Sequence, residues 1–228
     1  MPLNSILVAL LIYAGLFNAW VLPAQNIGRN SFSTVLLSPQ IYLFLASFFI
    51  IRFAQPLKLN IKAYFTHSII KNILYGLAYA SIIPFFSMFL LGAYSFLDYQ
   101  KTGQWFIPWH GQSICPYTQM DYAFLFLLAP LSEEIFFRGL LFPALKQKYN
   151  LHIAVLFSAL LFMSTHGTYH LGSLVLGVAM AYATHFHKSL WPAIIYHSVA
   201  NAYIPIMCWF FPNALSFFDK FTVFFFSQ

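Results

Sequence analysis

The sequence predicts an all-α fold, a polytopic membrane helical bundle with about seven (six to eight) transmembrane helices. Of its 228 residues, 61% are hydrophobic and only 7% are charged, whereas a soluble domain carries about 25% charged residues. The hydrophobic residues also form long continuous blocks, without the alternation that is typical of a transmembrane β-barrel. This composition excludes a soluble enzyme, a disordered segment and a disulfide-linked secreted module. We expect one integral membrane domain over residues 1–228.

Seven hydrophobic blocks are predicted to be membrane spans, because about 20 apolar residues are needed to cross roughly 30 Å of hydrocarbon. The second, fifth and sixth blocks are short for this task. The apolar tail Phe217–Phe226 is too short to span and is expected at the membrane interface or against the bundle. The predicted spans are Leu3–Leu22, Gln40–Phe53, Asn72–Leu97, Tyr122–Leu145, His152–His166, Leu171–Phe186 and Leu190–Phe211.

The distribution of basic residues predicts an orientation with the N-terminus in the cytoplasm. In this orientation seven of the 11 Lys and Arg residues face the cytoplasm and three face the opposite side, in agreement with the positive-inside tendency. The expected location is a prokaryotic cell membrane. The basic residues are scattered between apolar spans and form no stripe, so we expect no nucleic-acid partner. The connector Ala54–Lys71 is interpreted as an interfacial segment and Asp98–Met120 as a polar, aromatic connector.

The two glutamates of the chain, Glu133 and Glu134, are neighbours inside the fourth predicted span. A charged side chain at mid-membrane costs about 2.5–3.5 kcal/mol on insertion scales, so an adjacent pair indicates a function. Glu134 and Arg138 are four residues apart and can form an ion pair on one helix face. Glu133 points about 100° away and is predicted to face a cavity as a general base. Pro130 is expected to loosen the helix just before the pair.

Two histidines on other predicted spans are candidate partners for the acid pair. His166 ends the fifth span, and His170 follows one turn later. His197 and Asn201 are four residues apart in the seventh span and share a helix face. The helical rise brings these groups and the glutamates to a similar depth, which predicts one shared site. The remaining histidines that lie near span ends, His152, His185 and His187, are interpreted as interfacial.

Together these residues form three motifs: Glu133-Glu134-x-x-x-Arg138, Phe162-x-x-x-His166 and His197-x-x-x-Asn201. Their order and their placement on separate apolar spans resemble the CPBP (Abi) family, which includes CAAX prenyl endopeptidases and bacteriocin-processing or bacteriocin-immunity proteins. The resemblance covers residues 122–201, interpreted as the catalytic core.

The resemblance implies an intramembrane endopeptidase. In it, Glu133 would activate a water for attack on a peptide carbonyl, with help from His166. Glu134 and Arg138 would orient the site, and His197 with Asn201 would stabilise the oxyanion.

A metal cofactor stays open at this point. Glu133, His166 and His197 would be the ligands of one zinc ion if a metal is used. However, the chain has no HExxH helix, and Asn201 suits an oxyanion better than zinc. We therefore favour a metal-free glutamate mechanism.

Two other function classes remain as alternatives. Intramembrane Glu and His groups also occur in proton-coupled or haem- and ligand-binding membrane proteins, although the chain shows no repeat symmetry. A non-catalytic family member that acts in immunity or scaffolding is the other alternative. The expected partners are the lipid bilayer and a hydrophobic, lipidated or membrane-anchored peptide. Prenylated C-termini, bacteriocin leaders and C-terminal sorting tails all fit this description.

Overall fold

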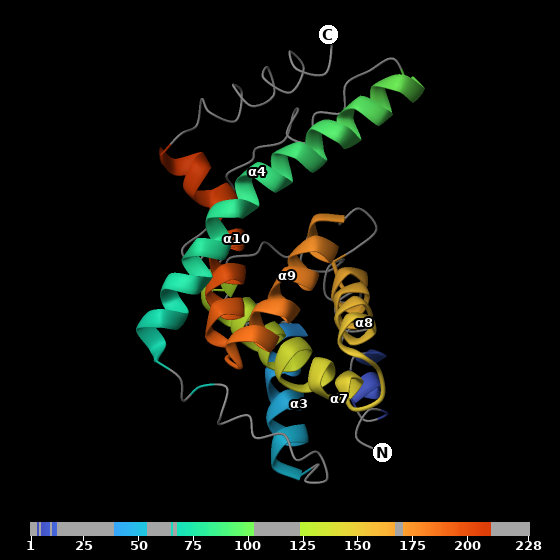
Figure 1. Cartoon of the computed structure of the whole chain (residues 1–228), viewed down its shortest axis with the longest axis vertical. Coiled ribbons are helices and arrows are strands. Elements are labelled where there is room, and N and C mark those ends of the chain that lie inside the picture. The colour runs from blue at the N-terminus through green and yellow to red at the C-terminus, as the bar shows by residue number, and fades with distance from the viewer. Residues whose placement is uncertain are drawn as a thin grey trace, which may run out of the picture.

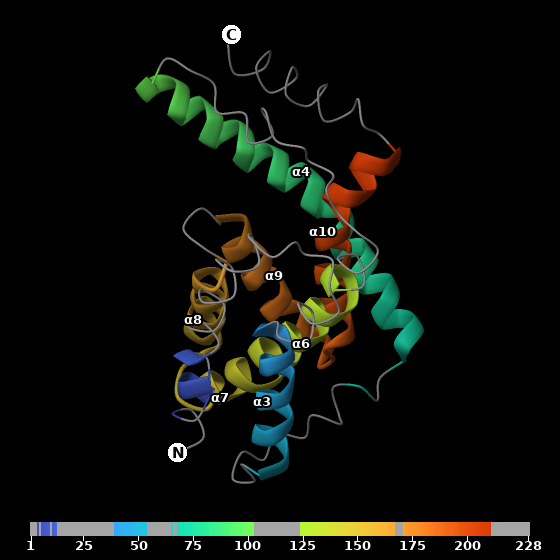
Figure 2. The same cartoon turned by 180° about the vertical axis from the view of Figure 1, so that it is seen from behind.

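The computed structural model describes residues 4, 6–9, 11–12, 39–53, 65, 68–102, 124–166 and 171–210, and its regular elements are all helical. No strand occurs within these ranges. The helices pack around one segment that runs through the middle of the molecule (Figures 1 and 2). In chain order they are α3 (Pro39–Phe53), α4 (Ile69–Thr102), η2 (Phe124–Leu128), α6 (Ala129–Glu134), η3 (Ile135–Leu141), α7 (Phe142–Lys146), α8 (Leu151–Ser164), α9 (Leu171–His187) and α10 (Trp191–Phe210).

The all-α prediction is confirmed for this part of the chain, and six predicted spans correspond to described helices. Helix α4 is longer than the predicted span, because its polar end Asp98–Thr102 continues the helix instead of belonging to a connector. In the described ranges no helix combines the length and the apolar character needed to cross a bilayer. The number of membrane spans therefore stays a prediction. Most of the first span and the tail Phe217–Phe226 lie outside the described residues.

Residues 124–146 form one continuous helical segment, the central helix, which alternates between π and α geometry. The π segments η2 and η3 each run up to an α segment that has a proline in its first turn, Pro130 in α6 and Pro143 in α7. A proline donates no backbone hydrogen bond and its ring clashes with the carbonyl four residues earlier. Widening the preceding turns into a π-helix relieves this conflict. The sequence predicted some loosening near Pro130, but not the second π segment.

The connections between the last helices use local hydrogen bonds. Helix α8 starts at Asn150, whose side-chain Oδ1 accepts a hydrogen bond from the Ile153 amide at 3.0 Å, the usual arrangement of an N-cap. Helix α9 ends at His187, and the next residue, Lys188, has a φ of 48°. The Trp191 amide at the start of α10 donates to Ser189 Oγ at 3.3 Å. These short turns hold α8, α9 and α10 against one another and against the central helix.

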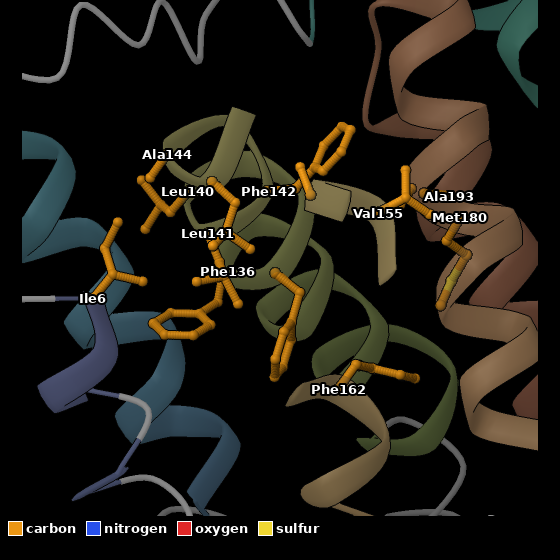
Figure 3. Packing of buried hydrophobic residues seen from close by; sticks show 14 of the residues in the cluster. Ile6, Phe136, Leu140, Leu141, Phe142, Ala144, Val155, Phe162, Met180 and Ala193 are labelled. Atoms are coloured by element: carbon orange, nitrogen blue, oxygen red, sulfur yellow. The ribbon is translucent and has the colours of Figure 1, made fainter. Parts of the chain in front are cut away.

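The hydrophobic core lies on both sides of the central helix. Figure 3 shows Ile6 and Ala144 on one side and Val155 and Met180 on the other. Many large apolar side chains instead face outward on α3, α4, α8 and α9. Several polar side chains, by contrast, are buried between the helices. The buried polar residues are Ser47, Asn72, Ser132, Glu133, Glu134, Arg138, Ser158, Thr165, Thr184, Ser189 and His197.

Two glycines allow close helix contacts. A Cβ on Gly76 of α4 would lie 2.7 Å from Ile195 Cβ and 3.1 Å from the Pro192 carbonyl oxygen of α10. A Cβ on Gly177 of α9 would lie 3.1 Å from Ala159 of α8. Small residues at such positions let helix backbones approach closely. The contacts of α4 with α10 and of α9 with α8 thus depend on the missing side chains.

We expect the substitution Gly76→Ala to destabilise the fold by about 1–3 kcal/mol, because the added methyl group forces α4 away from α10. The control is Gly172→Ala in α9, where a Cβ meets nothing within 4 Å and alanine is the better helix former by up to about 1 kcal/mol. Thermal unfolding of the purified protein in detergent measures both. A Gly76→Ala protein as stable as the Gly172→Ala protein would contradict the close contact.

Candidate functional site

The site is built on the central helix around the acid pair. Glu133 and Glu134 end α6, and both are buried, with 3% and 0% of their surface exposed. Arg138 lies in the π segment η3 and is fully buried. Its Nη1 donates to Glu134 Oε1 at 2.9 Å, and its Nη2 donates to the Gly177 carbonyl of α9 at 3.2 Å. The predicted ion pair between Glu134 and Arg138 is therefore present, and it also fastens α9 to the central helix.

Helix α10 brings His197 against both glutamates. Its Nδ1 lies 2.9 Å from Glu134 Oε1, and its Nε2 lies 3.9 Å from Glu133 Oε2. An ionised carboxylate only accepts hydrogen bonds, so Nδ1 carries a proton and donates a hydrogen bond to Glu134. Glu134 Oε1 therefore accepts from both Arg138 and His197. One carboxylate oxygen thus ties α10 to the central helix and fixes the orientation of the imidazole.

His166 approaches Glu133 from the end of α8. Its Nδ1 lies 2.9 Å from the Phe162 carbonyl oxygen, to which it donates, and its Nε2 lies 3.6 Å from Glu133 Oε2. The side chain is 29% exposed. Among the five residues Glu133, Glu134, Arg138, His166 and His197, it alone is more than a few per cent exposed. His166 is therefore the most exposed member of this group of five.

Two imidazoles thus point the same nitrogen at one carboxylate oxygen. In both rings Nδ1 donates a hydrogen bond to another acceptor. When such a ring is neutral, its Nε2 has no proton and carries a lone pair. Glu133 Oε2 is buried and has no hydrogen-bond partner among the described residues. The distances of 3.6 and 3.9 Å are too long for direct hydrogen bonds. They suit a small polar group, such as a water, held between the carboxylate and the rings.

The charges of this cluster do not cancel by themselves. Glu133 and Glu134 carry two negative charges, and Arg138 carries one positive charge. Glu134 is compensated by the guanidinium at 2.9 Å, whereas Glu133 faces only imidazoles. A buried unpaired charge is costly. Glu133 is therefore the acid of the pair that has no guanidinium at ion-pair distance among the described residues.

The Phe162 ring contacts Arg138 and both imidazoles. This residue had no role of its own in the sequence analysis. Its fully buried ring lies 4.3 Å from Arg138 Cζ, measured from the ring centroid, which is a cation–π geometry. The same ring packs edge-on against the His197 ring, with 5.6 Å between the centroids, and in a tilted arrangement against the His166 ring at 4.4 Å. The sequence feature that points to this contact is the spacing of four residues between Phe162 and His166, which predicts that both side chains lie on the same side of the chain at the end of α8.

The remaining sequence candidates lie on α8, α9 and α10, except for His170. Asn201 follows His197 by one turn on α10 and is half-buried. The helix-end histidines each contact a neighbouring helix: His152 Nδ1 lies 2.6 Å from the Tyr182 hydroxyl, His185 Nδ1 lies 3.0 Å from Lys146 Nζ, and His187 Nε2 lies 3.0 Å from the Tyr79 hydroxyl. They do not join the cluster around Glu133. His170 lies outside the described residues.

The donor set was also compared with the requirements of a metal ion. Carboxylate and imidazole donors, with each Nδ1 held by a hydrogen bond, match the chemistry of zinc ligands. However, no group of three or more His, Cys, Asp or Glu side chains within the described ranges is placed to hold an ion. Glu133, His166 and His197 are the residues that would hold a zinc ion if one binds, and the steps proposed below use these side chains alone.

Comparison with known families gives one match. Residues 116–203 match the family described as type II CAAX prenyl endopeptidase Rce1-like. The chain therefore carries an Rce1-like domain over these residues, in agreement with the resemblance to the CPBP family. The matched range includes all three motifs. Comparisons with curated proteins and with solved structures gave no match.

The two neighbouring glutamates should respond oppositely to the same substitution. We expect Glu134→Gln to destabilise the fold by about 3 kcal/mol, because it leaves the buried Arg138 guanidinium without its ionic partner. Glu133→Gln removes the uncompensated charge and should leave stability unchanged or raise it. Thermal unfolding of the purified proteins measures both changes, and equal effects would contradict the assigned pairing.

Proposed function

We propose that this protein is an intramembrane endopeptidase that hydrolyses a peptide bond with a water activated by Glu133. The observation that carries the proposal is the buried Glu133 Oε2, which has no hydrogen-bond partner among the described residues and lies 3.6 and 3.9 Å from the Nε2 atoms of His166 and His197. A water held there would lie within reach of a strong proton acceptor. The match of the surrounding residues to a CAAX prenyl endopeptidase family supports protease activity.

In the proposed reaction Glu133 removes a proton from the water as its oxygen attacks the carbonyl carbon of the peptide bond. The carbonyl oxygen becomes an oxyanion, and the tetrahedral intermediate then releases the amine. The proton taken by Glu133 passes to the leaving nitrogen, with His166 Nε2 close enough to assist the transfer. The products are one carboxylate and one amine, and Glu133 returns to its ionised state.

His197 and Asn201 are proposed to stabilise the oxyanion. Because His197 Nδ1 donates to Glu134, its Nε2 can donate to an oxyanion only when the ring carries both protons. Glu134 and Arg138 are then positioning residues: Glu134 orients the imidazole, and Arg138 holds Glu134 in place. Each oxyanion donor is worth about 3–4 kcal/mol in characterised hydrolases.

The proposed substrate is a lipidated or membrane-anchored peptide. The described helices expose large apolar side chains and bury polar ones, as expected when the surroundings are lipid. The Rce1-like family is membrane-embedded, which suits a substrate that is delivered along the bilayer. A prenylated CAAX peptide is the first substrate to test, followed by bacteriocin leaders and C-terminal sorting tails.

The first test is cleavage of a fluorogenic farnesylated CAAX peptide by the protein in proteoliposomes. We expect Glu133→Gln to lower kcat/KM by at least about 10²-fold, because it removes the general base without changing the shape of the side chain. The matched control is His152→Gln, which alters an exposed histidine outside the site. Equal cleavage by the wild type and Glu133→Gln would rule out the mechanism, whereas no cleavage by the wild type would favour a non-catalytic role.

The second test concerns the cofactor. A glutamate-activated water predicts that cleavage survives exhaustive chelation and that the purified protein contains no stoichiometric zinc. The measurements are residual activity after dialysis against a chelator and elemental analysis of the active fraction. Loss of activity that added zinc restores would replace this mechanism with a metal-dependent one.

A further inference from the structure

Away from the site, three basic side chains gather where α7 and α9 end. We call these three residues, Lys146, His185 and Lys188, the basic edge. Lys146 Nζ lies 3.0 Å from His185 Nδ1, across 39 positions of sequence. The positive charges of both lysines act on the His185 ring. Both lysines are exposed to the surroundings, so their ammonium groups are available to a ligand.

The hydrogen bond within the basic edge uses the acceptor atom of His185 and leaves only donor groups on the three side chains. An ammonium group has no lone pair, so Lys146 donates and His185 Nδ1 accepts. The proton of the His185 ring therefore sits on Nε2, where it can donate to another group. Lys188 adds a second ammonium. The patch thus presents two ammonium groups and one imidazole N–H to a ligand, which is the pattern expected for an anion.

The helix ends do not balance this charge. The C-termini of α7 and α9 each carry roughly half a negative charge from the helix dipole, which accounts for about one lysine. The basic edge has two lysines, and Lys148 adds a third exposed one in the same turn as Lys146. The sequence contains no Asp or Glu between Glu134 and Asp219. A surplus of about two positive charges therefore remains without an acidic partner from this region.

The backbone at Lys188 gives an independent indication. Its φ of 48° lies in the left-handed region, where glycine normally ends a helix. A side chain at this position costs of order 1 kcal/mol or more. Lysine occupies it nevertheless, which places an ammonium group beside His185. The strain is explained if the charge at this position has a function.

The surface next to the basic edge identifies the kind of ligand. Large apolar side chains are exposed on the first turns of α8 and at the end of α9, with Ile153 41%, Phe157 44% and Phe186 67% exposed. Helix α8 lies beside α9 in both views (Figures 1 and 2), and the bond from His152 to Tyr182 joins them at this end. A basic rim above an apolar band is typical of a surface that sits at a lipid headgroup layer.

We propose that the basic edge binds the phosphate of an anionic phospholipid headgroup, with Lys146, Lys188 and His185 Nε2 as donors. The proposal rests on the membrane location of the proposed function, but it does not depend on the catalytic chemistry. In the predicted orientation these residues face the cytoplasm, where anionic lipids attract basic side chains with about 1 kcal/mol for each Lys or Arg. The apolar band beside the patch would contact the acyl chains.

Native mass spectrometry of the full-length, detergent-purified protein tests this binding. The protein is delipidated and titrated at low salt with phosphatidylglycerol and, separately, with phosphatidylcholine. We expect tighter binding of phosphatidylglycerol to the wild type, and about a 30-fold loss of this affinity in Lys146→Gln/Lys188→Gly. Glycine at position 188 relieves the backbone strain, so the thermal stability of this variant should not fall while its lipid affinity does.

Two matched variants are the controls. Lys146→Arg/Lys188→Arg keeps both charges and should bind phosphatidylglycerol like the wild type. Lys71→Gln/Lys101→Gln removes the same number of charges from the two ends of α4 and should also bind normally. Glu133→Gln should bind normally while cleavage is lost, so a failure of the lipid site and a failure of the protease mechanism give different results.

Three outcomes would overturn the proposal. The first is equal phosphatidylglycerol affinity in the wild type and Lys146→Gln/Lys188→Gly. The second is equal affinity of the wild type for phosphatidylcholine and phosphatidylglycerol. The third is displacement of phosphatidylglycerol by inorganic phosphate at the same concentration, which would indicate a site for free anions instead of lipid.

Discussion

The double hydrogen bond to Glu134 Oε1 is the interaction on which the rest of the site depends. Arg138 and His197 both donate to this one oxygen at 2.9 Å, and all three residues are almost completely buried. Removing such groups from water costs several kcal/mol for each charge, and the cost is offset only if every partner is in place. The network therefore fixes the register of α10 against the central helix. Because Arg138 also donates to the Gly177 carbonyl, α9 is fixed by the same network.

This network gives two chemically identical residues, Glu133 and Glu134, different surroundings. Glu134 is held by a guanidinium and an imidazole, and its negative charge is neutralised. Glu133 is next in the chain, yet it faces two imidazole nitrogens beyond hydrogen-bond distance and has no cationic partner at the same range. Each carboxylate keeps one buried oxygen without a hydrogen-bond partner among the described residues, and that of Glu133 lies 3.6 and 3.9 Å from the Nε2 atoms of His166 and His197. The same difference would explain why an adjacent acid pair is tolerated in such an apolar chain.

The irregular geometry of the central helix is part of this arrangement. The π segments η2 and η3 flank the short α segment that carries both glutamates. Pro130 and Pro143 account for their positions, because each proline removes a backbone donor and crowds the turn before it. Such π segments are often found at functional sites. Here the wider turns of η3 place Arg138 so that it reaches both Glu134 and the neighbouring helix α9.

The sequence by itself determined the helical class, the approximate positions of six described helices and the three motifs. Long apolar blocks leave the backbone no alternative to internal hydrogen bonding, and a spacing of four residues predicts contact within a helix, as between Glu134 and Arg138. The tertiary structure decided everything that depends on how one helix is rotated against another. Only it shows that His197 binds Glu134 through Nδ1, that the Phe162 ring contacts both Arg138 and the two imidazoles, and that Lys146 meets His185. Spacing along one helix carries no information about such contacts, because they are set by side-chain packing between segments that are distant in the chain.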